Sequence, residues 1–337
     1  MPRRIIKGSL AALGILLLIL DARTALTGAS EGVALCLQTV IPSLLPFFIL
    51  SILLTASLTG VRMPILRPIE RLCGIPEGGG SLLLVGLLGG YPVGAQCVAQ
   101  AYQNGQLDAG NARRLLGFCS NAGPAFLFGM VAGKFSHAWM GWALWGIHIL
   151  SAITVGTILP GRQRANVELK PGPDVSMETA LKKAITVMTG VCGWVILLRV
   201  IIAFLDRWFL WLLSDEMRTV FCGLLELANG CCDLEVITNP GLRFVVAAGI
   251  LGFGGISVLM QTMSVTAQLG LGQYLPGRLL HCMVSVLLAF LCQRSSLPAG
   301  ENLAVSVWLL LPIFGLLIAI FLRKGKIKSR NLSAVGV

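Results

Sequence analysis

Apolar residues occur in long runs that recur from one end of the chain to the other. A helix needs about 20 apolar residues to cross the roughly 30 Å hydrocarbon core of a bilayer. Runs of this length predict membrane-spanning helices at residues 5–25, 33–59, 112–133, 138–159, 181–205, 243–264, 276–293 and 303–322. The pattern therefore predicts an all-α polytopic membrane protein.

Two further apolar stretches, residues 80–104 and 218–239, are interrupted near their middles. The interruptions are Gly89-Gly90-Tyr91-Pro92-Val93-Gly94 and Glu226-Leu227-Ala228-Asn229-Gly230. Backbone groups freed at such breaks are tolerated in a membrane only where they are buried in protein or line a wet cavity. We therefore expect two re-entrant hairpins in place of two simple crossings.

With the two stretches treated as hairpins, the predicted elements form two blocks of the same order: helix, hairpin, broken helix, helix. Residues 33–159 form the first block and residues 181–295 the second, in opposite orientations. Residues 1–32 are predicted to hold an N-terminal transmembrane helix, 160–180 a cytoplasmic loop, and 296–337 a C-terminal helix with a basic tail. Inverted repeats with interrupted segments are typical of secondary transporters, which bind their substrate near the membrane midplane.

The distribution of basic residues agrees with this topology. Cytoplasmic loops are enriched in Lys and Arg, and most of the 26 such residues fall in segments predicted to be cytoplasmic. Arg278 is counted among these cytoplasmic residues. Both termini are then cytoplasmic, in a multi-pass protein of the cell membrane.

Composition supports a membrane protein and narrows its partners. Charged residues make up 12% of the chain and hydrophobic residues 55%, whereas soluble domains carry about 25% charged residues. The net charge of +11 comes from basic residues in short loops, so nucleic acid is not an expected partner. The expected partners are a small-molecule substrate and the lipid bilayer, and a homo-oligomer is left open.

No enzyme, cofactor or metal site is expected from the motifs. The ten cysteines lie almost wholly in apolar segments, as buried free cysteines do. The glycine-rich segments lack the Gly-Lys-Ser or Gly-Lys-Thr of nucleotide loops, and no Ser, His and Asp set falls in a plausible common site. The coupling ion of a transporter, a proton or sodium, is left open.

Polar or glycine-rich residues interrupt the apolar pattern at four places, two in each block. Opened helix ends direct unpaired N–H groups, with partial positive charge, toward the centre of the protein. Such ends bind anionic groups. The candidate substrate-binding residues at these places are Gly90, Tyr91, Gly94, Ser120, Asn121, Gly123, Glu226, Asn229, Gly252, Gly254 and Ser257.

Each polar candidate also has a structural interpretation. Asn121 either bonds a ligand or bonds neighbouring backbone in a packing kink. Glu226 marks a substrate or proton path, since an ionisable group within a membrane costs at least ~2.5 kcal/mol, or it faces external water. His148 and His281 lack a carboxylate at helical spacing and are interpreted as packed or interfacial. Arg199 is interpreted as an arginine whose side chain extends to the membrane surface. The alternative is that it binds an anionic substrate.

Three motifs of the first block carry a resemblance to a known family. They are Ile41-Pro42-Ser43-Leu44-Leu45-Pro46-Phe47-Phe48, Gly90-Tyr91-Pro92-Val93-Gly94-Ala95 and Ser120-Asn121-Ala122-Gly123-Pro124. In this order they resemble sporulation integral membrane proteins of YlbJ type, of the nucleoside-recognition (Gate) family, over about residues 33–295. The resemblance implies movement of dipicolinic acid into the developing spore across the outer forespore membrane.

The layout is also similar to that of concentrative nucleoside transporters. That resemblance implies that Gly90 to Ala95 and Ser120 to Gly123 contact the substrate, and it matches Glu226 by residue type. Gly252-Phe253 keeps the first two residues of the Gly-Phe-Ala-Asn of those transporters. We expect a secondary transporter of a small polar or anionic solute, dipicolinic acid first. The alternatives are a carrier of nucleosides or other small solutes and a non-transporting scaffold or signalling protein.

Overall fold

The computed structural model describes residues 2–58, 61, 63–161 and 174–296. Within these residues every regular element is a helix and no strand is present, which confirms the all-α prediction. The predicted helix at 303–322 and the basic tail lie outside the described residues, as does most of the loop at 160–180.

The helices of the first half follow the predicted order, except that two helices occupy the start where one was predicted and that α4 is additional. They are α1 (Pro2–Leu20), α2 (Ala22–Leu35), α3 (Ile41–Leu58), α4 (Arg67–Cys73), α5 (Gly80–Gly89), α6 (Val93–Gln103), α7 (Ala109–Leu115), α8 (Pro124–Phe126) and α9 (Ala138–Ile158). A π-helical turn at Cys36–Val40 joins α2 to α3. The predicted end of the helix at 5–25 is wrong, because the Asp21 side chain caps α2 by accepting the Thr24 N–H at 3.3 Å and so starts a new helix.

The second half contains α10 (Met177–Trp208), α11 (Asp215–Leu225), α12 (Leu227–Cys232), α13 (Pro240–Phe253), α14 (Gly255–Val265) and α15 (Tyr274–Ser296). Among the described residues, five helical runs are long and apolar enough to cross a membrane by length and composition. They are Ala22–Leu58, Ala138–Ile158, Met177–Trp208, Pro240–Val265 and Tyr274–Gln293. The protein is therefore a multi-pass membrane protein.

Both predicted hairpins are pairs of short helices that pack against each other, α5 with α6 and α11 with α12. The first pair turns at Gly90, whose φ of 75° is readily adopted only by glycine. The second pair breaks at Glu226, where the backbone is extended. Whether the pairs enter and leave a membrane on one side stays a prediction.

Both predicted broken helices are interrupted as well. Residues 116–123 form turns and irregular backbone and separate α7 from α8. Gly254, with φ of 87°, separates α13 from α14. The order helix, hairpin, broken helix, helix thus occurs twice, as α3 to α9 and as α10 to α15. The opposite orientation of the two blocks and the predicted domain boundaries stay predictions.

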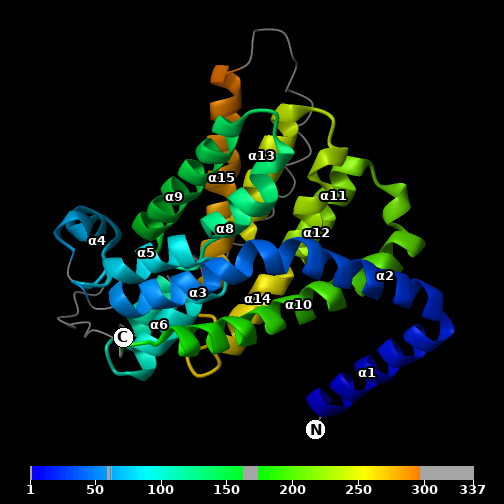
Figure 1. Cartoon of the computed structure of the whole chain (residues 1–337), viewed down its shortest axis with the longest axis horizontal. Coiled ribbons are helices and arrows are strands. Elements are labelled where there is room, and N and C mark those ends of the chain that lie inside the picture. Colours follow the sequence, from blue (N-terminus) through cyan, green and yellow to red (C-terminus); the bar gives the residue numbers. More distant parts are fainter. Residues whose placement is uncertain (1, 59–60, 62, 162–173, 297–337) are drawn as a thin grey trace, which may run out of the picture.

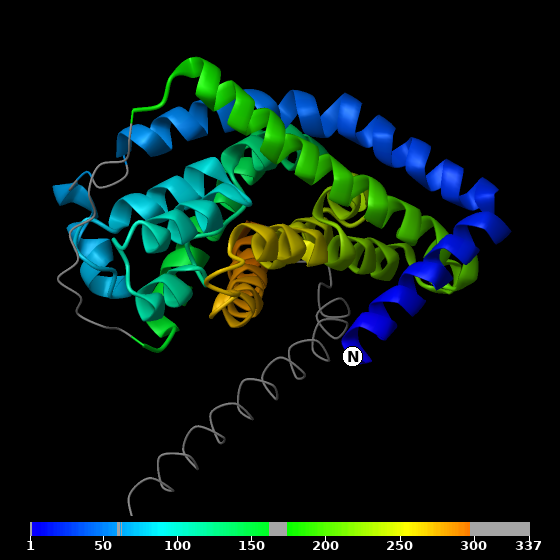
Figure 2. The ribbon, with the colours of Figure 1, turned by 90° about the horizontal axis from the view of Figure 1, so that it is seen from below.

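Two long helical runs cover one side of the interrupted helices (Figures 1 and 2). The α2–α3 run lies along α10, and small residues allow the close approach: a Cβ added at Gly28 would lie 2.8 Å from Ala203 Cβ. Arg199 of α10 forms a 2.6 Å ion pair with Glu31 of α2. Arg199 therefore has a partner within the chain at this contact.

On the other side, α9, α13 and α15 stand side by side (Figure 1). Gly252 lies in this contact, because a Cβ there would come 2.9 Å from Cys282 Cα. The contact brings α15, the last helix of the second block, against α9, the last helix of the first block.

Candidate functional site

A cavity of about 40 Å³ lies between the tips of the two hairpins. Four predicted site residues line it: Gly90, Tyr91, Gly123 and Glu226. The other lining side chains are mostly apolar and come from helices that include α3, α10 and α14. A cavity of this size holds only a few water molecules. A planar organic solute would therefore fit only after the surrounding helices move apart.

Glu226 is 2% exposed, and its carboxylate bonds the residues around the break of the second hairpin. Its Oε2 accepts hydrogen bonds from the Asn229 backbone N–H at 2.7 Å and from Asn229 Nδ2 at 2.8 Å. Its Oε1 accepts one from the Ser257 hydroxyl at 3.2 Å. Glu226 thus caps α12 and ties it to α14, while the predicted residues Asn229 and Ser257 serve as its partners.

Replacing Glu226 separates this capping role from a role in transport. Glu226→Gln keeps an amide oxygen for the Asn229 donors, and the Ser257 hydroxyl can turn to accept from the new NH₂ group. We expect the free energy of unfolding of Glu226→Gln to stay within about 1 kcal/mol of the parent value. For Glu226→Ala it should fall by about 1–2 kcal/mol, because the cap is lost. Melting in detergent measures both.

If Glu226 carries a proton or a cation, Glu226→Gln should also remove the dependence of transport on pH or on that cation. Uptake measured over a range of pH tests this. Uptake by Glu226→Gln equal to that of the parent at every pH would leave the residue with the capping role alone.

Two predicted glycines serve helix packing. A Cβ at Gly94 would overlap the Cys119 carbonyl oxygen and come 2.8 Å from Gly86 Cα. Gly252 packs on α15, as described above. Gly254 lies against the Tyr91 ring: a Cβ added at Gly254 would be 3.2 Å from Tyr91 Cζ. The break of the second broken helix therefore contacts the tip of the first hairpin. Ser120 is fully buried and has no hydrogen-bond partner for its hydroxyl among the described residues.

Asn121 bonds neighbouring backbone, as one interpretation expected, and also bonds a residue of the second block. Its Nδ2 donates to the Phe118 carbonyl at 2.8 Å, which is the local backbone role. Its Oδ1 accepts a hydrogen bond from Arg278 Nη2 at 3.3 Å. The second bond links the first broken helix to a residue 157 positions further along the chain.

Arg278 is the main residue of this cluster that the sequence patterns did not indicate. It was counted among the basic residues of a cytoplasmic segment, whereas in the structure it is buried, 1% exposed, in the second turn of α15. Its Nη1 donates to the Tyr91 hydroxyl at 2.8 Å, and its Nη2 donates to the Gly117 carbonyl at 3.2 Å. The guanidinium therefore binds the tip of the first hairpin as well as the first broken helix.

Aromatic rings surround the same guanidinium. Its Cζ lies 5.8 Å from the ring centroids of both Tyr91 and Tyr274, a distance at which the ring face attracts a cation. Tyr91 in turn donates its hydroxyl proton to the Leu251 carbonyl at 3.3 Å. Among the described residues, no Asp or Glu forms an ion pair with Arg278.

Two buried histidines continue the polar cluster; they are packed, as one of the two interpretations expected, but they contact each other rather than lying alone. His148 of α9 and His281 of α15 are 2% and 0% exposed. His148 Nδ1 lies 3.0 Å from His281 Nε2, and His148 Nε2 accepts the Ala122 N–H at 3.0 Å. His281 Nδ1 lies 3.4 Å from Arg278 Nη2.

One feature of the sequence could have indicated this cluster. Arg278 and His281 are three residues apart, which places them on one face of a helix. Their partners Tyr91, Asn121 and His148 come from the other block, and no spacing in the sequence relates them.

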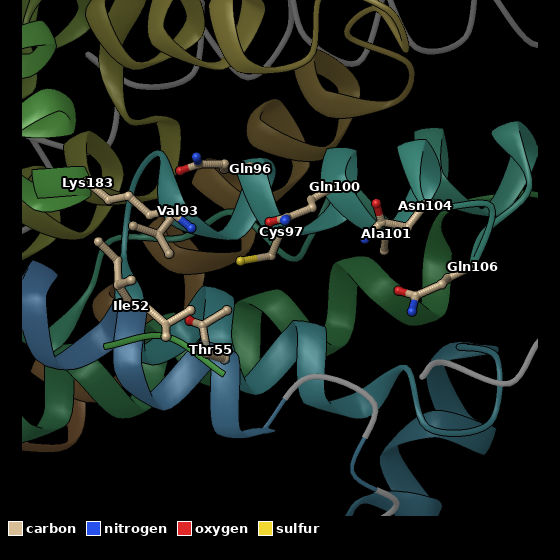
Figure 3. Close-up of a pocket in the computed structure, with 12 residues that line it drawn as sticks. Ile52, Thr55, Val93, Gln96, Cys97, Gln100, Ala101, Asn104, Gln106 and Lys183 are labelled. Atoms are coloured by element: carbon tan, nitrogen blue, oxygen red, sulfur yellow. The ribbon is translucent and has the colours of Figure 1, made fainter. Parts of the chain in front are cut away.

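A second cavity, of about 90 Å³, runs beside α6. Figure 3 shows Gln96, Gln100 and Asn104 along this helix, with Lys183 of α10 near Val93. The three amides are exposed, whereas most of α6 is buried. The rest of the cavity lining is mostly apolar, so a row of amides faces an apolar wall between the loop after α6 and Val93, next to the hairpin tip.

Comparison with known proteins gives one relative. Over 134 residues the chain is 39% identical to the sporulation integral membrane protein YlbJ of Bacillus subtilis (strain 168). The match covers 38% of this chain, and the chain spans about a third of the length of that relative, 32%. No family model matches the chain, and no solved structure matches it. The similarity confirms the predicted resemblance: the chain is a polytopic membrane protein related in sequence to the sporulation integral membrane protein YlbJ.

Proposed function

We propose that this protein is a secondary transporter that carries a small anionic solute across the membrane through the region between the two blocks. The observation that carries the proposal is the buried guanidinium of Arg278, which forms no ion pair with a described carboxylate and binds the first hairpin tip and the first broken helix. A buried charge without a counter-charge is costly, so such groups in membrane proteins mark substrate or ion paths.

An anionic substrate would offset that cost. Arg binds carboxylates through parallel N–H donors in a fixed geometry, which favours planar acids. Lys183 lines the α6 cavity and adds positive charge beside its row of amides, where an anion would enter. Neither group would favour a neutral solute in the same way.

Dipicolinic acid, pyridine-2,6-dicarboxylate, is the substrate that we propose. It is a planar dianion, and the sequence similarity to a sporulation integral membrane protein supports a role for this chain in sporulating cells. On this proposal the protein acts in the outer forespore membrane with both termini in the cytoplasm, and it needs no cofactor. A proton or sodium ion is the coupling ion that we propose to test, with Glu226 as its candidate ligand.

Uptake into vesicles tests the proposal. Purified protein reconstituted into lipid vesicles should accumulate labelled dipicolinate at a saturable rate, and unlabelled dipicolinate should compete while uridine should not. Protein-free vesicles are the control. Accumulation of uridine in place of dipicolinate would indicate a nucleoside carrier, and accumulation of neither would indicate a non-transporting scaffold or signalling protein.

A further inference from the structure

The hydrogen-bond chain through the two histidines has a direction that the structure determines. A backbone N–H can only donate, so His148 Nε2, which receives the Ala122 N–H, must be unprotonated. Neutral His148 therefore carries its proton on Nδ1 and donates it to His281 Nε2 at 3.0 Å. His281 Nε2 is then the acceptor, and the proton of His281 lies on Nδ1.

This direction makes the last link a contact between two donors. His281 Nδ1–H faces Arg278 Nη2, which also donates, at 3.4 Å. The opposite tautomer of His281 would only move the conflict, because two N–H groups would then meet between the histidines. Both side chains are at most 1% exposed, and Arg278 Nε has no partner among the described residues. What the pair lacks is an acceptor.

We propose that Arg278 and His281 form a two-donor clamp for one carboxylate of the transported solute, with His148 as a positioning residue that sets the tautomer of His281. A carboxylate oxygen accepts from several donors at once, so one oxyanion satisfies His281 Nδ1–H and the guanidinium together. The clamp rests on the proposed function and specifies its substrate class as carboxylates. The hydrogen-bond chain then runs without conflict from Ala122 through His148 and His281 to the solute.

The Asn and Gln variants of each histidine test the clamp, because they place an amide at different ring nitrogens. The Asn amide lies where Nδ1 lies, and the Gln amide reaches the place of Nε2. At position 281, His281→Asn keeps a donor beside Arg278 and His281→Gln does not. At position 148, His148→Asn keeps the donor toward His281, whereas His148→Gln loses it and frees His281 to change tautomer.

We expect His281→Gln to raise the apparent KM for dipicolinate about 10- to 100-fold, the usual value of a hydrogen bond to a charged group. His281→Asn should stay within about 5-fold of the parent. His148→Gln should weaken binding more than His148→Asn does. If the Asn and Gln variants at position 281 have the same KM as the parent, the clamp is excluded while the transporter assignment stands.

A spectroscopic measurement tests the clamp separately from transport. The chain has three histidines, so ¹⁵N-histidine labelling with His137→Asn as an assignment control resolves the pair. We expect the Nδ1–H tautomer at both His148 and His281, and a shift of the His281 Nδ1 signal when dipicolinate or pyridine-2-carboxylate is added. Pyridine-3-carboxamide, which is neutral, should cause none. The Nε2–H tautomer at His281 would overturn the proposal, whereas a carboxylate-dependent shift in a protein that transports nothing would overturn only the transport function.

Discussion

Replacing Arg278 with Met is expected to abolish transport while lowering the level of folded protein in the membrane only moderately, and less than Arg114→Met does. The variant removes the charge that would bind the anionic solute, and losing two or more charge-assisted hydrogen bonds corresponds to at least about 100-fold in transport rate at low solute concentration. Removing the charge relieves the cost of burying it without a counter-charge, but it leaves the Gly117 carbonyl and Asn121 Oδ1 without this donor. A loss of function much larger than the loss of stability is therefore the expected signature.

Arg114 offers a matched control, because it is another arginine that is 1% exposed. Its guanidinium donates to the carbonyl oxygens of Cys73, Gly74, Gly156 and Leu159 and so joins three segments of the first block. Arg114→Met leaves those carbonyls without their donor and should lower the melting temperature and the membrane level. Quantitative blotting, melting in detergent and uptake distinguish the two arginines.

Arg278→Lys refines the test, since it keeps the charge but loses the planar set of donors. We expect a loss of about 10-fold or more in the apparent affinity for dipicolinate. Transport by Arg278→Met within about 3-fold of the parent rate would contradict the assignment of Arg278 to the substrate site.

The largest expected effect on stability follows from Gly94→Ala. The added methyl group would overlap the Cys119 carbonyl and the backbone of Gly86, so α6 would have to move away from α5 and from the break after α7. Backbone cannot rearrange as a flexible side chain does, and overpacking of a tight core costs about 1–3 kcal/mol or more. Little folded Gly94→Ala should reach the membrane.

Gly190→Ala in α10 is the matched control, because apart from the neighbouring backbone of its own helix no described atom lies within 4 Å of the position that its Cβ would take. Alanine is also the better helix former by about 1 kcal/mol, so this variant should be as stable as the parent or slightly more stable. Expression level and melting in detergent measure both variants. A normally folded Gly94→Ala that fails only in transport would return Gly94 to the substrate-binding residues.

Much of the fold could be predicted from local pattern. Apolar run length predicted the long helices, and the freed backbone at Gly90, Glu226 and Gly254 predicted breaks that the structure contains. The end of the first helix was predicted wrongly, because a single capping residue, Asp21, outweighs the continuity of an apolar run. A hydrophobicity pattern reports burial over many residues and cannot weigh one side-chain hydrogen bond.

The residues of the candidate site were likewise predictable only in part. Gly90, Tyr91, Gly123 and Glu226 were predictable because each interrupts an apolar segment, and they do line one cavity. Gly94 also interrupts an apolar segment, so the pattern could not show that Gly94, unlike those four residues, does not line the cavity. Gly94 packs against Cys119 instead, and that contact depends on how two helices cross.

The sequence by itself determined the helical membrane fold, its interrupted segments and the resemblance to a sporulation membrane protein, because these depend on composition and on neighbours along the chain. Only the tertiary structure decided that Arg278 is buried against Tyr91, 187 positions away, and that His281 meets His148, 133 positions away. An arginine near the start of a helix carries the same local signature in a cytoplasmic loop as in a buried cluster. What distinguishes the two is which helices pack beside it, since the burial of a charge is a property of the assembled protein.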